Sequence, residues 1–95
     1  SNHMKNIKLI VLEYCPYCKQ ALSYIEELKQ EDSKYQNIEI EIIDEQKEKE
    51  KTLNFEYYYV PTFYLDDIKY YEGIVTKEII KNLFDEVTDG ASRTV

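Results

Sequence analysis

Two cysteines separated by two residues are the part of this sequence whose spacing could support chemistry. They belong to the stretch Cys15-Pro16-Tyr17-Cys18, and the chain has no other cysteine. Two thiols at this spacing lie on one helical turn, within reach of a disulfide bond. A pair that follows a strand and opens a helix is typical of a redox centre rather than a structural cross-link.

The residues around the motif predict such a strand and helix. Residues 7–12 are almost continuously apolar and rich in β-branched side chains, as in a strand buried on both faces. After the motif, apolar residues recur at steps of three and four, which predicts a helix with one buried face: Cys18, Ala21, Leu22, Ile25 and Leu28. Pro16 suits the first turn of a helix. The sequence therefore places Cys15 at a helix N-terminus.

The position of each cysteine predicts its role. A thiol attacks a disulfide as its thiolate, so the attacking cysteine needs a lowered pKa. A helix N-terminus favours the thiolate through unpaired N–H groups and the positive end of the helix dipole. We therefore predict that Cys15 is the nucleophile, and that Cys18, one turn further in, is more buried and acts as the resolving thiol. Either Cys18 or a second small thiol would release the product from a mixed disulfide with Cys15.

Two structural uses of the cysteines compete with this interpretation. A zinc site needs about four ligands, and the only histidine, His3, lies in a Ser1-Asn2-His3 stretch before Met4 that is typical of an expression-tag remnant. A structural disulfide is disfavoured in a reducing compartment. Redox use of the pair is therefore favoured, and no metal is expected.

Length and charge narrow the class of protein. The 95 residues carry a net charge of −7 and one arginine, Arg93, which argues against binding to nucleic acid or to anionic membranes. We expect one domain over residues 4–90, a tag remnant at 1–3 and a loose tail at 91–95. No secretory signal and no segment long enough to span a bilayer are recognised, so we expect a cytoplasmic protein, and a monomer.

The rest of the chain predicts a small α/β domain. Its expected elements are a strand over residues 38–43, a short solvated helix within 44–53, strands at 62–65 and 68–71, and a helix over 76–87. Asp66-Asp67 would turn the two later strands into a hairpin. Thr76 would cap the start of the last helix and Gly90 its end. The order is β-α-β-α-β-β-α, with a four-stranded mixed sheet flanked by helices that can cover both faces.

The motif and a second proline resemble those of a known family. Cys15-Pro16-Tyr17-Cys18 after a strand, with Val60-Pro61 ahead of the third strand, resembles dithiol glutaredoxins of the thioredoxin-like superfamily. The resemblance covers residues 7 to about 87 and implies the thioredoxin-like fold. It also implies that Pro61 follows a cis peptide bond, and that the backbone of Val60 pairs with the cysteine moiety of glutathione.

We expect Tyr17, which lies inside the motif, to contact the substrate, and the resemblance implies that the glutathione or substrate site also includes Gly73 and Thr76. Glutaredoxins usually carry a lysine three residues before the first cysteine, where this chain has Leu12. They usually have Gly-Gly and an acidic pair before the last helix, where this chain has one glycine, preceded by Glu72. Without the lysine, and with this carboxylate nearby, we expect weak glutathione binding.

Some features are closer to thioredoxins. Pro61-Thr62-Phe63 is one of them, although the Trp-Cys-Gly-Pro-Cys motif is absent and Leu9 stands where thioredoxins bury an aspartate. The sequence therefore predicts a thiol–disulfide oxidoreductase acting on protein or glutathione mixed disulfides, without a tightly bound cofactor. Its reductant is either glutathione, as co-substrate, or a flavoprotein of the thioredoxin-reductase type. Two alternatives are an iron–sulfur cluster module that uses glutathione and a redox adaptor for one dedicated protein partner.

Overall fold

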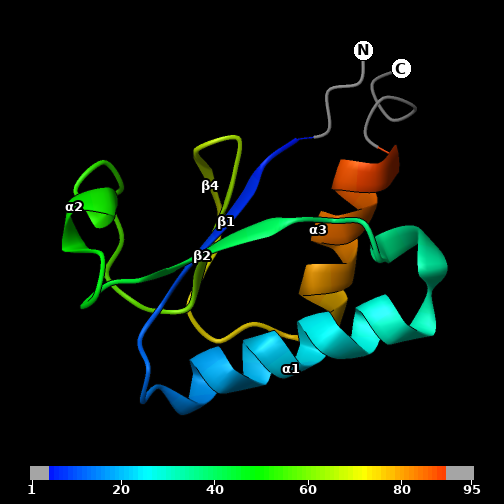
Figure 1. The fold of residues 1–95 in the computed structure, drawn as a ribbon, viewed down its shortest axis with the longest axis horizontal. Helices are drawn as coiled ribbons and strands as arrows, with labels where there is room; N and C mark the ends of the chain where they lie inside the picture. The colour runs from blue at the N-terminus through cyan, green and yellow to red at the C-terminus, as the bar shows by residue number, and fades with distance from the viewer. Residues whose placement is uncertain (1–4, 90–95) are drawn as a thin grey trace.

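A four-stranded mixed sheet forms the centre of the computed structural model, which describes residues 5–89 (Figure 1). The elements in chain order are β1 (Ile7–Val11), α1 (Pro16–Glu31), the 3-10 helix η1 (Ser33–Tyr35), β2 (Ile40–Asp44), α2 (Lys49–Thr52), β3 (Thr62–Leu65), β4 (Ile68–Glu72) and α3 (Lys77–Asp89). This order confirms the predicted β-α-β-α-β-β-α arrangement. The predicted tag remnant, the cap at Gly90 and the tail lie outside the described residues.

The strands follow the order β2-β1-β3-β4 across the sheet. β1 pairs in parallel with β2 and antiparallel with β3, and β3 pairs antiparallel with β4. The parallel pair is the one joined through α1, because parallel neighbours need a crossover connection. The two central strands are buried on both faces, which explains why β1 reads as a continuous apolar run.

Helices α1 and α3 cover the same face of the sheet (Figure 1). Helix α1 buries the residues that the periodicity predicted, Cys18, Ala21, Ile25 and Leu28. They form one core with residues from α3 and from the strands: Ile80, Leu83, Phe84, Leu9 and Phe63. The first turn of α1, which carries the cysteine motif, is thereby fixed against the end of β1.

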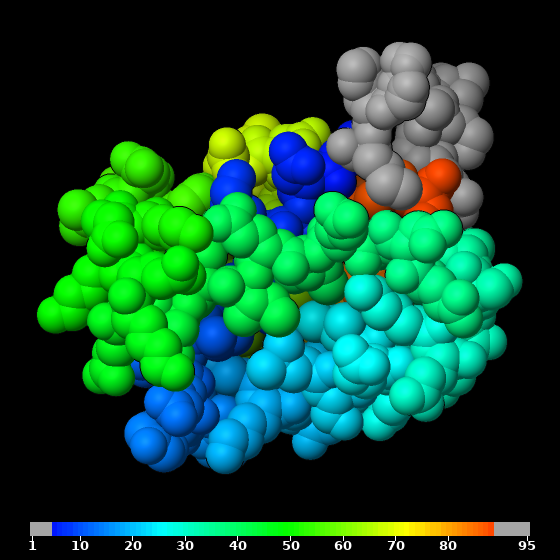
Figure 2. Space-filling view, in the orientation of Figure 1, coloured from blue at the N-terminus to red at the C-terminus, as the bar shows by residue number. Residues whose placement is uncertain are grey.

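The opposite face is covered by a largely irregular segment. Ile10, Ile43 and Tyr64 form its buried core, with Phe55 and Tyr57 packed over them. The segment over residues 45–60, drawn green in Figure 2, contains only the four residues of α2 as α-helix. We expected helices on both faces of the sheet. On this face the cover consists of one short helix, α2, and the side chains of Phe55 and Tyr57. None of the helices within residues 5–89 is long and apolar enough to cross a membrane.

The boundaries of the strands agree with the predictions to within one residue except at β2. β3 has the predicted bounds, and the turn after it has positive φ at both Asp66 (52°) and Asp67 (67°), as in a two-residue hairpin turn. β2 begins at Ile40 rather than Ile38. Ile38 is nevertheless buried against the core of α1 and α3, which accounts for the apolar signal at that position.

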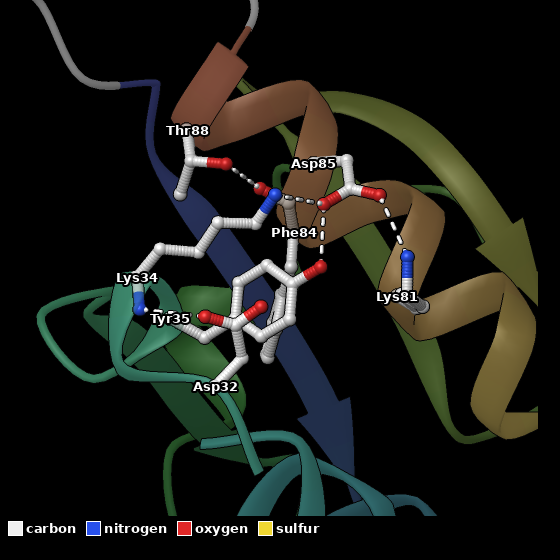
Figure 3. Close-up of polar contacts among 7 residues, drawn as sticks. All are labelled: Asp32, Lys34, Tyr35, Lys81, Phe84, Asp85 and Thr88. Carbon is white, nitrogen blue, oxygen red and sulfur yellow. Dashed lines mark hydrogen bonds and ion pairs between the residues drawn. The ribbon is translucent and has the colours of Figure 1, made fainter.

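A buried tyrosine joins η1 to α3 (Figure 3). The Tyr35 hydroxyl donates to Asp85 Oδ1 at 2.5 Å, and its ring lies 5.4 Å from that of Phe84, tilted by 57°. Lys34 and Lys81 form ion pairs with the same carboxylate at 3.5 and 3.3 Å. These bonds lower the pKa of Asp85 although its burial acts in the opposite direction. The contact fixes the end of α1 and η1 against the last helix.

Candidate active site

Cys15 is the N-cap residue of α1, and its sulfur caps the helix. The residue has an extended backbone, and Pro16 follows in the first turn. Cys15 Sγ accepts a hydrogen bond from the backbone N–H of Cys18 at 3.1 Å. A sulfur in this position satisfies one of the N–H groups that have no partner within the helix. The structure thus places Cys15 where the sequence predicted.

Cys18 is the more buried of the two thiols, as predicted. Its exposed fraction is 1%, whereas Cys15 is half-buried, and both are free thiols. Burial, with smaller contributions from a hydrogen bond with Cys15 and from the charge of Cys15, raises the pKa of the Cys18 thiol to about 12. Cys18 is therefore held as a thiol while Cys15 is also reduced.

The difference between the two cysteines predicts a selective alkylation. At neutral pH iodoacetamide should modify Cys15 and leave Cys18 as the thiol, because Cys15 is the more accessible sulfur and the raised pKa of Cys18 leaves little of its reactive thiolate. The rate at Cys18 should rise about tenfold per pH unit from neutral pH to about pH 10, since its pKa of about 12 lies above this range. Peptide mass spectrometry after timed quenching measures both rates. Unfolded protein, in which both cysteines should react, is the control, and equal rates in folded protein at neutral pH would contradict the assignment.

A loop before β3 lies against the nucleophile. We call residues 57–61 the active-site loop. The peptide bond between Val60 and Pro61 is cis, as the resemblance implied. The Val60 carbonyl oxygen lies 3.8 Å from Cys15 Sγ, in position to accept a weak hydrogen bond from the thiol. Residues 45 positions apart in the sequence are thus brought together at the N-terminus of α1.

Gly73 supports the same loop from the end of β4. Its backbone N–H donates to the Pro61 carbonyl oxygen at 2.9 Å. Its φ of +100° lies in a region that favours glycine, and nothing lies within 4 Å of where a Cβ would be. Backbone conformation, not space, therefore accounts for a glycine here. Of the predicted substrate residues, Val60 lies beside Cys15, and Gly73 is bonded to Pro61, the next residue of the loop.

The other two predicted substrate residues, Tyr17 and Thr76, lie outside the active-site loop. Tyr17 is 51% exposed, one residue before the buried thiol. The Thr76 hydroxyl accepts a hydrogen bond from the N–H of Ile79 at 3.2 Å, which confirms its predicted role as a cap of α3.

A cleft of about 180 Å³ opens beside the nucleophile, and its walls are formed by Leu12, Glu13, Tyr14, Cys15 and Gln46. No group of three metal-ligating side chains occurs within residues 5–89.

Glu72 is the residue of this region whose contacts the sequence did not predict. Its carboxylate accepts hydrogen bonds from the backbone N–H groups of Tyr58 and Tyr59 and from Lys69. These bonds, with that from Lys69 the largest cause, lower the pKa of Glu72 to about 2. The sequence showed only an acidic side chain near the predicted glutathione site. The carboxylate is bonded to N–H groups of the active-site loop because the end of β4 lies beside that loop, which the sequence does not show.

The sheet, the dithiol at the start of α1 and the cis-proline loop together define a thioredoxin-like redox domain. The thioredoxin domain family matches residues 5–85, and the chain belongs to this family. A comparison with curated protein sequences gave no match. The family and the neighbouring thiols indicate a thiol–disulfide oxidoreductase. The finer prediction, a glutaredoxin that uses glutathione, stays a prediction.

Solved structures give the same fold. A mutant thioredoxin from Halobacterium salinarum NRC-1 superposes with a TM-score of 0.66 over 90% of this chain and 76% of its own, at 17% sequence identity. The protein Ne2328 from Nitrosomonas europaea, determined by NMR, superposes with a TM-score of 0.58 over 87% of this chain and 94% of its own, at 14% identity. At these identities the likeness concerns the fold, and the thioredoxin-like prediction for the fold is confirmed.

Proposed function

We propose that this protein is a disulfide reductase in which Cys15 attacks the substrate and Cys18 resolves the mixed disulfide. The observation that carries the proposal is the placement of Cys15 Sγ. It accepts the Cys18 N–H at 3.1 Å and lies 3.8 Å from the Val60 carbonyl oxygen. One sulfur is thus next to a helix N-terminus and to a backbone edge that can pair with an extended substrate.

The proposed cycle transfers two electrons. The Cys15 thiolate attacks a substrate disulfide, whose S–S bond breaks, and one substrate sulfur leaves as a thiolate. Cys18 then loses its proton and attacks Cys15 Sγ, which releases the second substrate thiol and forms the Cys15–Cys18 disulfide. An external reductant supplies two electrons to restore both thiols.

Formation of the mixed disulfide itself favours the second step. Two of the causes that raise the pKa of Cys18 come from Cys15, namely its hydrogen bond and its charge. Both are lost once Cys15 Sγ is bonded to the substrate, while the effect of burial stays. The Cys18 pKa therefore falls in the intermediate, where a thiolate is needed, and not before.

The proposed substrates are disulfide-containing proteins and glutathione mixed disulfides. The reductant is glutathione or a flavoprotein of the thioredoxin-reductase type. Position 12, where glutaredoxins usually carry a lysine, is Leu12, so a glutathione carboxylate would lack that partner. We propose that the protein acts as a monomer in the cytoplasm, where both thiols are kept reduced between turnovers.

A paired reductant assay tests the proposal. One arm supplies NADPH, glutathione and glutathione reductase, and the other supplies NADPH and a thioredoxin reductase. Both use the same glutathionylated peptide as substrate, and NADPH oxidation is followed by absorbance. We expect turnover in at least one arm, and a glutathione arm that saturates only at high glutathione concentration. Absence of turnover in both arms, with two thiols confirmed by titration, would refute the proposed function.

A further inference from the structure

The middle of the active-site loop has no packed side chain, although Tyr57 and Val60 on either side of it pack against the core. Tyr58 and Tyr59 are 89% and 70% exposed, so their side chains do not hold the loop by packing. The residues also belong to no helix or strand. The position of the stretch that leads into Val60 therefore depends on bonds to the backbone of Tyr58 and Tyr59.

Glu72 supplies those bonds. It is the last residue of β4 and pairs with Thr62, the first residue of β3. Its Oε2 accepts the N–H groups of both Tyr58 and Tyr59, the latter at 2.8 Å. Its Oε1 accepts Lys69 Nζ at 2.6 Å, which fixes the orientation of the carboxylate. Both oxygens are thus engaged within the chain.

Two further bonds extend this connection to the proline. The Thr62 hydroxyl donates to the Tyr59 carbonyl oxygen, and the Gly73 N–H donates to that of Pro61. The loop is therefore bonded on both sides of Val60 to residues 62, 72 and 73. Among these bonds, those of Glu72 are the ones formed by an ionised group, and such hydrogen bonds are the stronger kind.

We propose that Glu72 is a positioning residue that holds the backbone of Val60 ready to pair with the peptide segment around a substrate disulfide. The inference rests on the proposed function and names a determinant of its substrate class. Without the carboxylate, the two loop N–H groups can bond to water, since this part of the loop is exposed. The fold then keeps its core, whereas substrate binding must order a mobile loop and becomes weaker.

Single-turnover reduction by pre-reduced protein tests this role independently of the physiological reductant. The substrates are a disulfide-linked peptide, which has a backbone to pair with Val60, and 2-hydroxyethyl disulfide, which is neutral and has none. For Glu72→Ala we expect the peptide concentration at half-maximal rate to rise about tenfold, the scale of one lost hydrogen bond to a charged group. The maximal rate, and the second-order rate with 2-hydroxyethyl disulfide, should stay as in the wild type.

Two further variants separate positioning from charge and from folding. Glu72→Gln keeps an acceptor oxygen and should show a smaller increase than Glu72→Ala. Glu86→Gln removes one charge from α3, where Glu86 pairs with Lys5 at 4.0 Å, and should behave as the wild type. Amide hydrogen exchange by NMR should be faster at Tyr58 and Tyr59 in Glu72→Ala, with exchange at Leu9 and Phe63 unchanged.

The outcomes distinguish this inference from the proposed function. If the wild type is active and Glu72→Ala has the same half-maximal peptide concentration as the wild type, the inference is overturned and the proposed function is not. An equal increase in Glu86→Gln, or equal losses with both substrates, would overturn it in the same way, since these would indicate a charge effect or a structural role. A wild-type protein that reduces neither disulfide would refute the proposed function, and the positioning role with it.

Discussion

Cys15→Ser is expected to lower disulfide turnover by about three orders of magnitude or more, the scale seen when other covalent enzymes lose their nucleophile. A serine at this position can still cap α1, because a hydroxyl oxygen accepts the Cys18 N–H as the sulfur does. It cannot attack a disulfide, since the reacting species is a thiolate. Turnover in the paired reductant assay, with circular dichroism to verify the fold, measures the loss.

Cys18→Ser is the matched control, because it removes the other thiol of the pair. It should still form a mixed disulfide through Cys15, and an added small thiol should release the product from it. Without added thiol, the covalent complex should accumulate and be visible by mass spectrometry. If Cys15→Ser kept its turnover while Cys18→Ser lost it, the roles of the two cysteines would be reversed.

The parts of the fold that sequence could predict are those with local signals. The helix after the motif follows from apolar steps of three and four, and β3 has the predicted bounds of residues 62–65. The dithiol lies within four residues, so its geometry follows once the helix is placed. The position of Val60 beside Cys15 spans 45 residues, and it was predicted only through the resemblance to glutaredoxins.

The parts that were missed depend on partners far away in the sequence. Tyr35 lies in a polar stretch that gave no sign of a core residue, yet it is fully buried against Phe84. Its hydroxyl is satisfied by Asp85, 50 residues later, and that hydrogen bond offsets the cost of burying the hydroxyl. Glu72 is similar, because its role depends on the loop that faces β4. Periodicity within one element carries no information about such contacts.

Phe84→Ala is expected to lower the free energy of unfolding by about 3–5 kcal/mol, the usual cost of removing a buried phenylalanine side chain. Phe84 is fully buried in α3, within the core that joins α1, α3 and the sheet. Small domains have total stabilities of about 5–15 kcal/mol, so this loss is a large fraction of the stability of the domain. Urea denaturation followed by circular dichroism measures the change, and Phe84→Leu, which fills part of the cavity, should lose less.

Tyr35→Phe separates the polar contact from the packing, because it keeps the ring against Phe84 and removes the hydroxyl that bonds to Asp85 (Figure 3). We expect a loss of about 1.5–3 kcal/mol at neutral pH, typical of a hydrogen bond to a charged group. The pKa of Asp85 is lowered in the folded state, so its contribution is present above the unfolded-state pKa and is lost as pH falls through the folded-state value. The difference between wild type and Tyr35→Phe should therefore shrink in acid, whereas the Phe84→Ala deficit should persist. A Tyr35→Phe deficit that stays constant down to the lowest pH at which the protein folds would show that the ionised Asp85 is not the partner that matters.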